Sequence, residues 1–235
     1  VNRHESLRTV FLEKEGVGYQ ELLSSAEFHI ERKTFYNTTE KMLEVVISNE
    51  VNRPFDLSKD YMLRVKVLEL SEEVNVLVVV MHHIAADGWS IPILINELEE
   101  LYNSGLSGKP IRLPELPVQY ADYSIWQREY LSGEILDKRL GYWENQLDGV
   151  ETLELPLDFN RPATQSNQGA SYTFKLEIAQ SNQLKALAKE NGTTLFMLLL
   201  TLYKVLLHRY TNQEDICVGV PVANRSESAI SGLIG

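Results

Sequence analysis

Two adjacent histidines, His82 and His83, lie shortly before Asp87 and Gly88, and this segment is the part of the chain best equipped for chemistry. An imidazole beside a cavity accepts a proton near neutral pH or hydrogen-bonds to a developing charge. Successive side chains of a strand point to opposite faces, so the two histidines face apart if the preceding strand continues through them. One of them is then free to face a cavity. Two packed histidines without a chemical role stay a competing interpretation.

A metal site is not expected at this segment. Two histidines that face apart do not readily share one ion. A helical zinc motif needs its histidines four residues apart, which this segment does not offer.

Asp87 lies just before a predicted helix start, and three roles compete for it. It can cap the helix by accepting hydrogen bonds from amides of the first turn, form a dyad with His83, or pair with an arginine. The spacing alone favours the N-cap. Gly88 permits a backbone conformation that other residues resist.

The elements around this segment alternate between strands and helices. The buried strand that leads into the histidines is predicted over 74–81, because it is almost wholly apolar, and it is expected to be buried on both faces. The stretch from Gly88 onward has apolar residues at helical spacing. Further expected elements are a hairpin over 9–23, helices over 38–51, 118–131, 134–147, 181–191 and 194–210 (the last buried), and strands over 61–70, 171–178 and 215–222. This order predicts a mixed α/β fold, and the proline-containing stretch 155–169 is the candidate lobe boundary.

Composition excludes several classes of protein. The net charge of −11 leaves no basic face for nucleic acid, and no apolar stretch reaches membrane-spanning length. Cys217 is the single cysteine, so no disulfide forms within the chain, and it is expected to be a small buried residue in a strand. These features predict a cytoplasmic protein. Val1 begins the sequence without a signal peptide, and both ends are expected to be cut rather than natural.

Three motifs together resemble the condensation domains of nonribosomal peptide synthetases. Residues 82–90 are similar to the family's HHxxxDG motif, which the wider chloramphenicol acetyltransferase-like superfamily shares. Residues 3–11 resemble RHExLRTxF, and residues 120–126 resemble YxDYxxW. Shorter segments at 53–57, 155–162 and 219–225 resemble further stretches of the family in the same order. The resemblance covers essentially the whole chain.

The resemblance implies a two-lobed acyltransferase fold with a tunnel between the lobes. Residues 1–165 would form the N-terminal lobe, and residues 166–235 would begin an incomplete C-terminal lobe. Donor and acceptor carrier domains, next to an adenylation domain, would each deliver an aminoacyl or peptidyl thioester on a phosphopantetheine arm. The acceptor amine would attack the donor carbonyl to form an amide. The domain itself would bind no cofactor or metal.

The resemblance also implies roles for individual residues. His83 would lie at the centre of the tunnel, either as a general base or as a group that orients the amine, and His82 would belong to the same motif. Asp87 would pair with an arginine of the first motif, with Arg8 the first choice and Arg3 the second. Gly88 would let the substrate arm approach. Trp89, Ser90 and Trp126 would line the tunnel or pack the lobe, although Trp126 also fits a plain core aromatic.

Some alternatives stay open. The chain has about half the length of a condensation domain and lacks the family's first and later motifs, so we expect it to be inactive by itself and to expose apolar surface. An epimerization domain shares HHxxxDG, but Trp89, Ser90 and the YxDYxxW match favour condensation. A heterocyclization domain carries aspartates in place of both histidines. A silent recruitment domain and a stand-alone acyltransferase are the remaining competitors.

Overall fold

The computed structural model describes residues 1–36, 38–164, 166, 169–225 and 227–235. Contacts between Cα atoms divide the chain into two compact units. The first combines Val1–Leu136 with Val222–Gly235, and the second is Asp137–Pro221. The predicted boundary near residue 165 concerns the lobes of the family fold, and that boundary stays a prediction.

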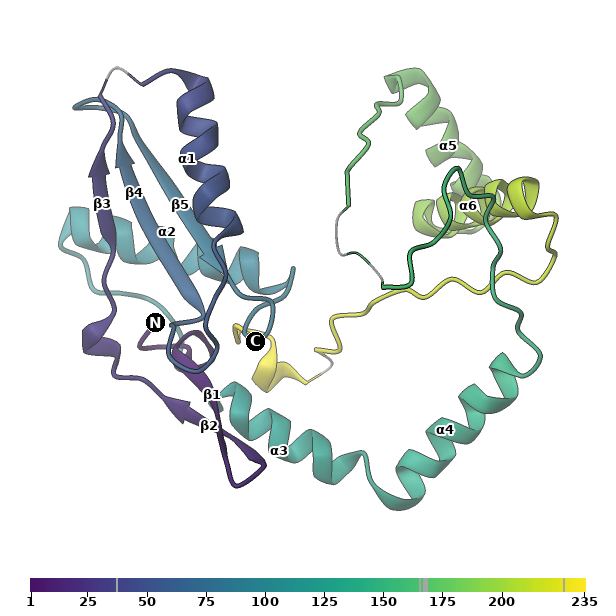
Figure 1. Ribbon diagram of the computed structural model, residues 1–235, viewed down its shortest axis with the longest axis horizontal. Coiled ribbons are helices and arrows are strands. Elements are labelled where there is room, and N and C mark those ends of the chain that lie inside the picture. Colours follow the sequence, from purple (N-terminus) through teal and green to yellow (C-terminus); the bar gives the residue numbers. More distant parts are fainter. Residues whose placement is uncertain (37, 165, 167–168, 226) are drawn as a thin grey trace. The chain divides into compact units, whose positions relative to one another are not determined.

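The first unit is built on a mixed three-stranded sheet (Figure 1). Its order is β3 (Glu31–Thr34), β4 (Leu63–Glu69) and β5 (Asn75–Met81). The β3–β4 pair is parallel, whereas β4 and β5 are antiparallel. In chain order, one helix lies between β3 and β4 and another follows β5. The predicted mixed α/β fold is therefore confirmed.

Strand β5 differs from the prediction of a strand buried on both faces. Val78 is buried, but the side chains of Leu77 and Val79 are 46% and 37% exposed. Within the described residues β5 has a hydrogen-bonded neighbour, β4, on one side only. Its apolar run therefore reflects one well-covered face and one partly open face.

A hairpin precedes the sheet in the chain, as predicted. It pairs β1 (Thr9–Lys14) with β2 (Val17–Leu22) in antiparallel register. The two residues of its turn, Glu15 and Gly16, have φ values of 55° and 78°. Two consecutive positive φ values are typical of a type I′ turn, whose twist matches the twist of the flanking strands.

Helix α1 (Glu40–Asn52) ends just before the arginine and proline at 53–54, as predicted. Its buried side is rotated from the side that the apolar pattern predicts, which runs through Met42, Val45 and Val46. Met42 and Val45 are more than half exposed, whereas Val46 is partly covered and Glu50 is buried. The rotation turns the Glu50 carboxylate toward basic residues of the sheet: its Oε2 lies 2.6 Å from the Nζ of Lys66.

Helix α2 (Ser90–Ser107) starts directly after the histidine segment. It ends at Gly108, whose φ of 66° gives the left-handed cap that glycine favours. Ile91 and Ile95 of the predicted apolar stripe are about half exposed, whereas Leu94 and Glu97 are partly covered.

The core of the first unit joins distant parts of the chain. Leu7, Leu63, Ala86 and Ile234 are each at most 6% exposed and form one cluster. Ala86 belongs to the histidine segment, and Leu7 belongs to the short helix η1 (Glu5–Arg8). The core therefore fixes the histidine segment against the first motif of the sequence.

Four more helices follow along the chain. They are α3 (Tyr120–Tyr130), α4 (Gly133–Leu147), α5 (Ile178–Glu190) and α6 (Leu195–Thr211). All four were predicted, although α5 starts earlier than expected. Within the described residues, none of the helices is long and apolar enough to cross a membrane.

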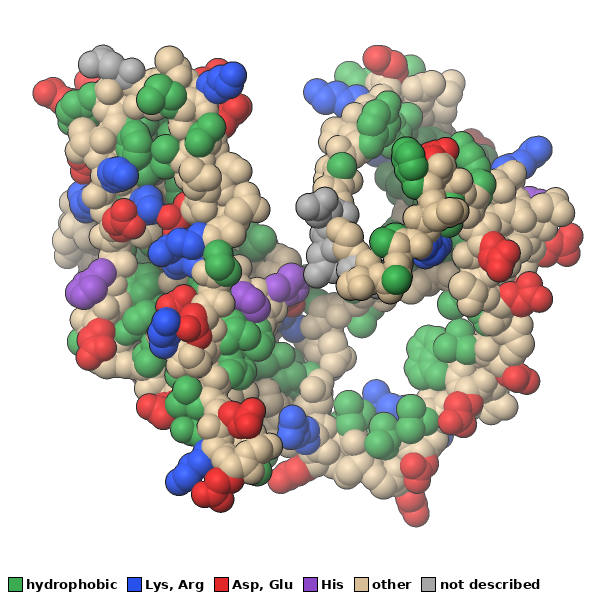
Figure 2. Space-filling view, viewed as in Figure 1, with side chains coloured by type: hydrophobic (Ala, Val, Ile, Leu, Met, Phe, Trp, Pro, Cys, Tyr) green, Lys and Arg blue, Asp and Glu red, His purple; other side chains and the backbone are tan. Residues whose placement is uncertain are grey.

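The second unit departs from the prediction in its strands and its burial. The described residues of 171–178 and 215–222 form no strand, because no neighbouring strand pairs with them there. Helix α6 was expected to be buried, but Leu207 is its one buried residue. Figure 2 shows hydrophobic side chains on the surface around α5 and α6. Cys217 is exposed rather than buried.

Candidate active site

The histidine segment begins where β5 ends. The His82 amide donates a hydrogen bond to the Met62 carbonyl (2.9 Å), and the Met62 amide donates to the Leu7 carbonyl (3.0 Å). The backbone of His82 is thus linked through Met62 to the first motif. The His82 ring also turns back onto its own loop, where Nδ1 accepts from the Ile84 amide at 3.0 Å.

Two side chains hold the His82 ring from the other side. The Phe55 ring meets His82 edge to face, with centroids 5.5 Å apart. The Arg64 guanidinium lies 3.7 Å from the centroid of the Phe55 ring, which is a cation–π contact. Arg64 is itself fixed by three backbone carbonyls in the stretch 50–54 and by an ion pair with Glu50. His82 is therefore a structural member of the site.

His83 differs from His82 in its exposure and in its contacts. Its side chain is exposed, and within the described residues it makes no hydrogen bond, ion pair or ring contact. Both ring nitrogens are free for a substrate. The two histidines thus separate into one that is anchored and one that is available. Strand β5 ends at Met81, before both of them, so the expectation that they face apart on a continuing strand stays a prediction.

Asp87 pairs with an arginine, one of the roles that the sequence left open, and bonds to the start of α2, although the N-cap residue itself is Trp89. Its Oδ1 accepts from the Ser90 amide and from the Ser90 hydroxyl, both at 2.8 Å. Ser90 is the first residue of α2, so Asp87 caps the turn that leads into this helix. The same Oδ1 also lies 3.2 Å from the Arg225 guanidinium.

The ion pair with Arg225 corrects the predicted partner. Arg8 donates to Glu5 (3.0 Å) and to the Leu23 carbonyl (2.9 Å), and Arg3 pairs with Glu97 (2.7 Å). Neither bonds to Asp87, because each has a nearer acceptor. The predicted pairing of Asp87 with Arg8 or Arg3 is therefore wrong, although the prediction of an arginine partner is right.

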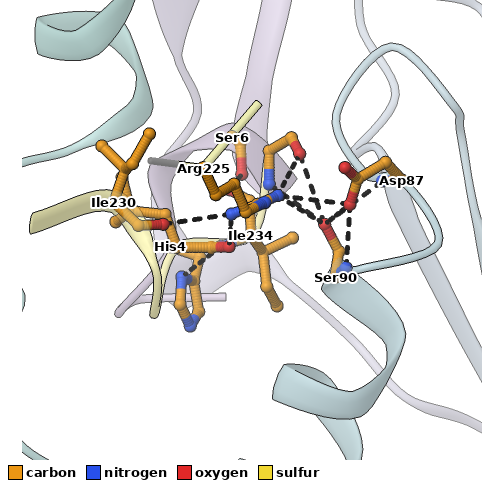
Figure 3. Close-up of polar contacts among 9 residues, drawn as sticks. His4, Ser6, Asp87, Ser90, Arg225, Ile230 and Ile234 are labelled. Carbon is orange, nitrogen blue, oxygen red and sulfur yellow. Dashed lines mark hydrogen bonds and ion pairs between the residues drawn. The ribbon is translucent and has the colours of Figure 1, made fainter. Parts of the chain in front are cut away.

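Arg225 fastens the segment 227–235 to the histidine loop. Its guanidinium is 7% exposed and donates to the carbonyls of Ile230 (3.1 Å), Leu233 (2.6 Å) and Gly235 (2.7 Å). Figure 3 shows Arg225 between Ile230 and the pair formed by Asp87 and Ser90. One buried cation thus satisfies three backbone acceptors and one carboxylate.

Electrostatics keep Asp87 ionised. Burial raises its pKa, but the hydrogen bonds from Ser90 and the charge of Arg225 outweigh burial, so the pKa lies below its usual value. An ionised Asp87 only accepts hydrogen bonds, which matches the three donors around it. Its role in this geometry is to hold the loop.

His4 adds a second buried contact to the same segment. Its Nδ1 accepts from the Ile234 amide (3.2 Å), so Nε2 carries the ring proton and donates to Glu97 (2.8 Å). Burial lowers the pKa of His4, and Glu97 raises it without offsetting burial. His4 is therefore held in its neutral form. Its place in the first motif had suggested no such role.

The other predicted residues differ in how far they are buried. Ser90 is completely buried, whereas Trp89 is 53% exposed at the start of α2. Gly88 is exposed, and a Cβ added there would meet nothing within 4 Å. Trp126 is 44% exposed and stacks on Tyr130 with ring centroids 5.1 Å apart. A structural role for Trp126 and a tunnel role for Trp89 stay predictions.

No metal centre is apparent in the described part of the chain. No three histidine, cysteine, aspartate or glutamate side chains gather there in a way that could hold an ion. Hydrogen bonding and ion pairing, rather than coordination, account for the arrangement of the site.

Comparison with known proteins identifies the class of protein. The model of the condensation domain matches residues 1–235, so the chain belongs to the condensation-domain family. Condensation domains are acyltransferases that work with the carrier and adenylation domains of peptide synthetases. The predicted family is thereby confirmed.

Individual relatives are consistent with this family. The chain is 40% identical over 237 residues to gramicidin S synthase 2 of Brevibacillus brevis; the match covers 100% of this chain and 5% of that protein's length. Its fold is similar to the X-domain from teicoplanin biosynthesis (TM-score 0.86, 26% identity), covering 99% of this chain and 52% of that one. It is also similar in fold to the epimerization domain from the third module of tyrocidine synthetase B (TM-score 0.79, 20% identity), with 99% and 55% covered.

Sequence reasoning missed Arg225 and the pair of His4 with Glu97. Arg225 lies 138 residues after Asp87, and such a separation hides the contact. The one available signal was its place at the end of a segment, 219–225, that resembles the family. His4 and Glu97 stand among other polar and charged residues in the sequence, so nothing there marks them as a pair.

Proposed function

We propose that the domain joins a donor acyl or aminoacyl thioester to the amine of an acceptor aminoacyl thioester. Both would be carried on phosphopantetheine arms of carrier domains. The observation that supports this proposal is the unpartnered His83 ring on a loop that His82 and Asp87 anchor within the described structure. A group that must meet two substrates in turn needs free hydrogen-bonding capacity and a fixed backbone.

His83 can take part in the reaction at the step in which the acceptor amine attacks and loses a proton. The acceptor nitrogen attacks the donor carbonyl, forming the C–N bond, and the C–S bond to the donor arm breaks. The nitrogen loses a proton and the departing thiolate gains one. With both ring nitrogens free, His83 can accept the amine proton or orient the amine by a hydrogen bond. An amine that is partly neutral near pH 7–8 needs little base strength, so orientation contributes to the rate.

The partners follow from the same proposal. A donor carrier and an acceptor carrier supply the thioesters, and an adjacent adenylation domain loads the acceptor. The phosphopantetheine belongs to the carriers, and the domain itself holds neither a cofactor nor a metal. A cytoplasmic location accords with the use of carrier-bound thioesters.

The test uses a condensation domain of full family length that carries this sequence. One donor-loaded and one acceptor-loaded carrier are mixed with it, and carrier-bound products are weighed by mass spectrometry. We expect a dipeptidyl thioester on the acceptor carrier that depends on His83.

Two other outcomes would overturn the proposal. Inversion of one residue on a single carrier would identify an epimerization domain, whose fold this chain shares. Intact loaded carriers and no amide, across a panel of aminoacyl groups, would indicate a recruitment domain.

A further inference from the structure

A pocket of about 310 Å³ opens beside the histidine segment. It lies between hairpin β1–β2, the loop after His83 and helix α3. Ile84 and Ala85, the two residues that follow His83, form part of its wall. Consecutive Cα atoms are about 3.8 Å apart, so the pocket begins within one residue of the proposed active-site histidine.

The exposed wall of this pocket is largely apolar. Large side chains that line it stay partly open to solvent: Leu22 is 46% exposed, Ile84 43% and Tyr120 37%. Phe11 and Ala121 complete this apolar wall. Apolar groups held at a concave surface gain free energy when a ligand covers them.

Four polar side chains of the wall are already in use, and the other polar groups there, the Gln20 amide and the Tyr120 hydroxyl, carry no charge. The Glu5 carboxylate pairs with Arg8 (3.0 Å), and the Ser6 hydroxyl donates to the Ile234 carbonyl (2.7 Å). The hydroxyls of Thr9 and Ser124 donate to backbone carbonyls at 2.8 and 3.0 Å. A charged ligand group would find no free counter-charge among these residues. The pocket therefore favours an uncharged apolar group.

We propose that this pocket accepts the apolar side chain of one of the two aminoacyl groups joined at His83. The assignment rests on the proposed function. In an aminoacyl thioester the side chain branches from the carbon next to the thioester carbonyl. In this proposal, a residue that reacts at His83 carries its side chain toward Ile84, the neighbouring residue, which lines the pocket. The volume is at the small end of the usual range for ligand pockets, roughly 300–1,000 Å³, and suits a side chain rather than a whole carrier arm.

Ala121 offers a direct way to change the pocket. It lies on α3 and is exposed, so Ala121→Leu adds volume to the wall without disturbing a packed core. Leucine also has a high helix propensity, so α3 should persist. Ala121→Ser nearly preserves the volume and is the matched control.

The experiment measures amide formation in a condensation domain of full family length that carries this sequence. One arm varies the acceptor among glycyl, leucyl and phenylalanyl groups with the donor fixed, and the other varies the donor with the acceptor fixed. In one arm, Ala121→Leu is expected to lower kcat/KM for the large groups relative to glycyl by roughly tenfold or more, while Ala121→Ser keeps the wild-type preference. The responding arm identifies which of the two groups enters the pocket.

Different results would overturn the pocket assignment alone or the proposed function as well. Normal rates with an unchanged preference in both arms, or an equal loss for glycyl and large groups, would overturn the pocket assignment and leave the proposed function standing. A wild-type domain that forms no amide with any pair of substrates would overturn the proposed function and the pocket assignment with it.

Discussion

The two histidines are neighbours in sequence but belong to different structural regions. His82 is fixed by the Met62 carbonyl, the Ile84 amide and the Phe55 ring. His83 is exposed and, in the described part of the chain, has no such partner. Asp87 and Ser90 resemble His82, because their side chains are anchored as well.

This difference explains how a short loop serves both structure and chemistry. The side chains of His82, Asp87 and Ser90 hold the backbone, so the exposed His83 side chain has a defined backbone position without being occupied. If the His83 ring were hydrogen-bonded within the protein, that bond would have to break before the ring could act on a substrate. The variants below are ranked by their expected effect on stability, from the anchored residues to the free one.

Removal of the Arg225 guanidinium should have the largest effect on stability. Arg225→Ala leaves Asp87 without its ion pair and three carbonyls without donors, so we expect a loss of about 2–3 kcal/mol in the free energy of unfolding. Fully buried pairs lose roughly 3–5 kcal/mol, and this pair is weaker because Asp87 is 32% exposed. Chemical denaturation of the full-length domain measures the loss.

An exposed ion pair supplies the control. Lys59 lies 2.9 Å from Asp56 at the surface, and Lys59→Ala should leave the free energy of unfolding almost unchanged, because solvent screens an exposed ion pair. Asp87→Ala should also act mainly through stability, as its contacts with Ser90 and Arg225 require. An Arg225→Ala protein as stable as the wild type would contradict the anchoring role.

The aromatic support of His82 should have a smaller effect. Phe55→Leu removes the contacts with the Arg64 guanidinium and the His82 ring, and we expect a loss of about 1–2 kcal/mol. The chain contains a matched control in Phe35, which lies 5.2 Å from the Lys33 ammonium and touches no histidine within the described residues.

Activity distinguishes the two phenylalanines further. Phe55→Leu should lower the rate of amide formation in addition to stability, and Phe55→Tyr should restore it, whereas Phe35→Leu should leave the rate unchanged. Equal rates of amide formation for Phe55→Leu and Phe35→Leu would show that the contact of Phe55 with His82 does not contribute to catalysis.

The free energy of unfolding should depend on pH through His4. This effect should be smaller than those of the variants above, because a single group titrates. Burial keeps the folded-state pKa of His4 below its unfolded value of about 6.5. The unfolded chain therefore binds the proton first, and stability present above pH 6.5 is lost as the pH falls toward the folded pKa. Unfolding curves between about pH 7.5 and 5.5 check this.

The His4→Gln variant has no titrating ring and should show a flatter profile over that range. Identical slopes for the two proteins would assign the dependence to other groups. Asp87 contributes only at lower pH, since its folded pKa lies below the unfolded value of about 3.9.

Much of the first unit was predictable from local patterns. The hairpin, the strand before His82 and the helix after Gly88 follow from alternation, apolar runs and helical spacing, which act over a few residues. The partner of Asp87 was not predictable, because Arg225 is distant in sequence and Arg8 and Arg3 are equally charged. The prediction of strands at 171–178 and 215–222 was wrong for a related reason. A strand needs a neighbouring strand to pair with, and the apolar pattern alone does not provide one.

Burial was harder to predict than element type. The apolar stripe of α2 and the run of α6 suggested covered faces, yet Ile95 and Phe196 are 55% and 58% exposed. Periodicity shows which side of a helix is apolar, but not what covers it. The same limit applies to Cys217, whose apolar neighbours predicted a buried position.

The most direct test of the account is His83→Ala in the full-length domain, with single-turnover amide formation and unfolding measured on the same protein. Because His83 is exposed and unpartnered in the described structure, the free energy of unfolding should change by no more than about 0.5 kcal/mol. Amide formation should fall by about 100-fold or more. Retained activity, or a loss of activity matched by a loss of stability, would contradict the assignment of His83 as the free catalytic residue on an anchored loop.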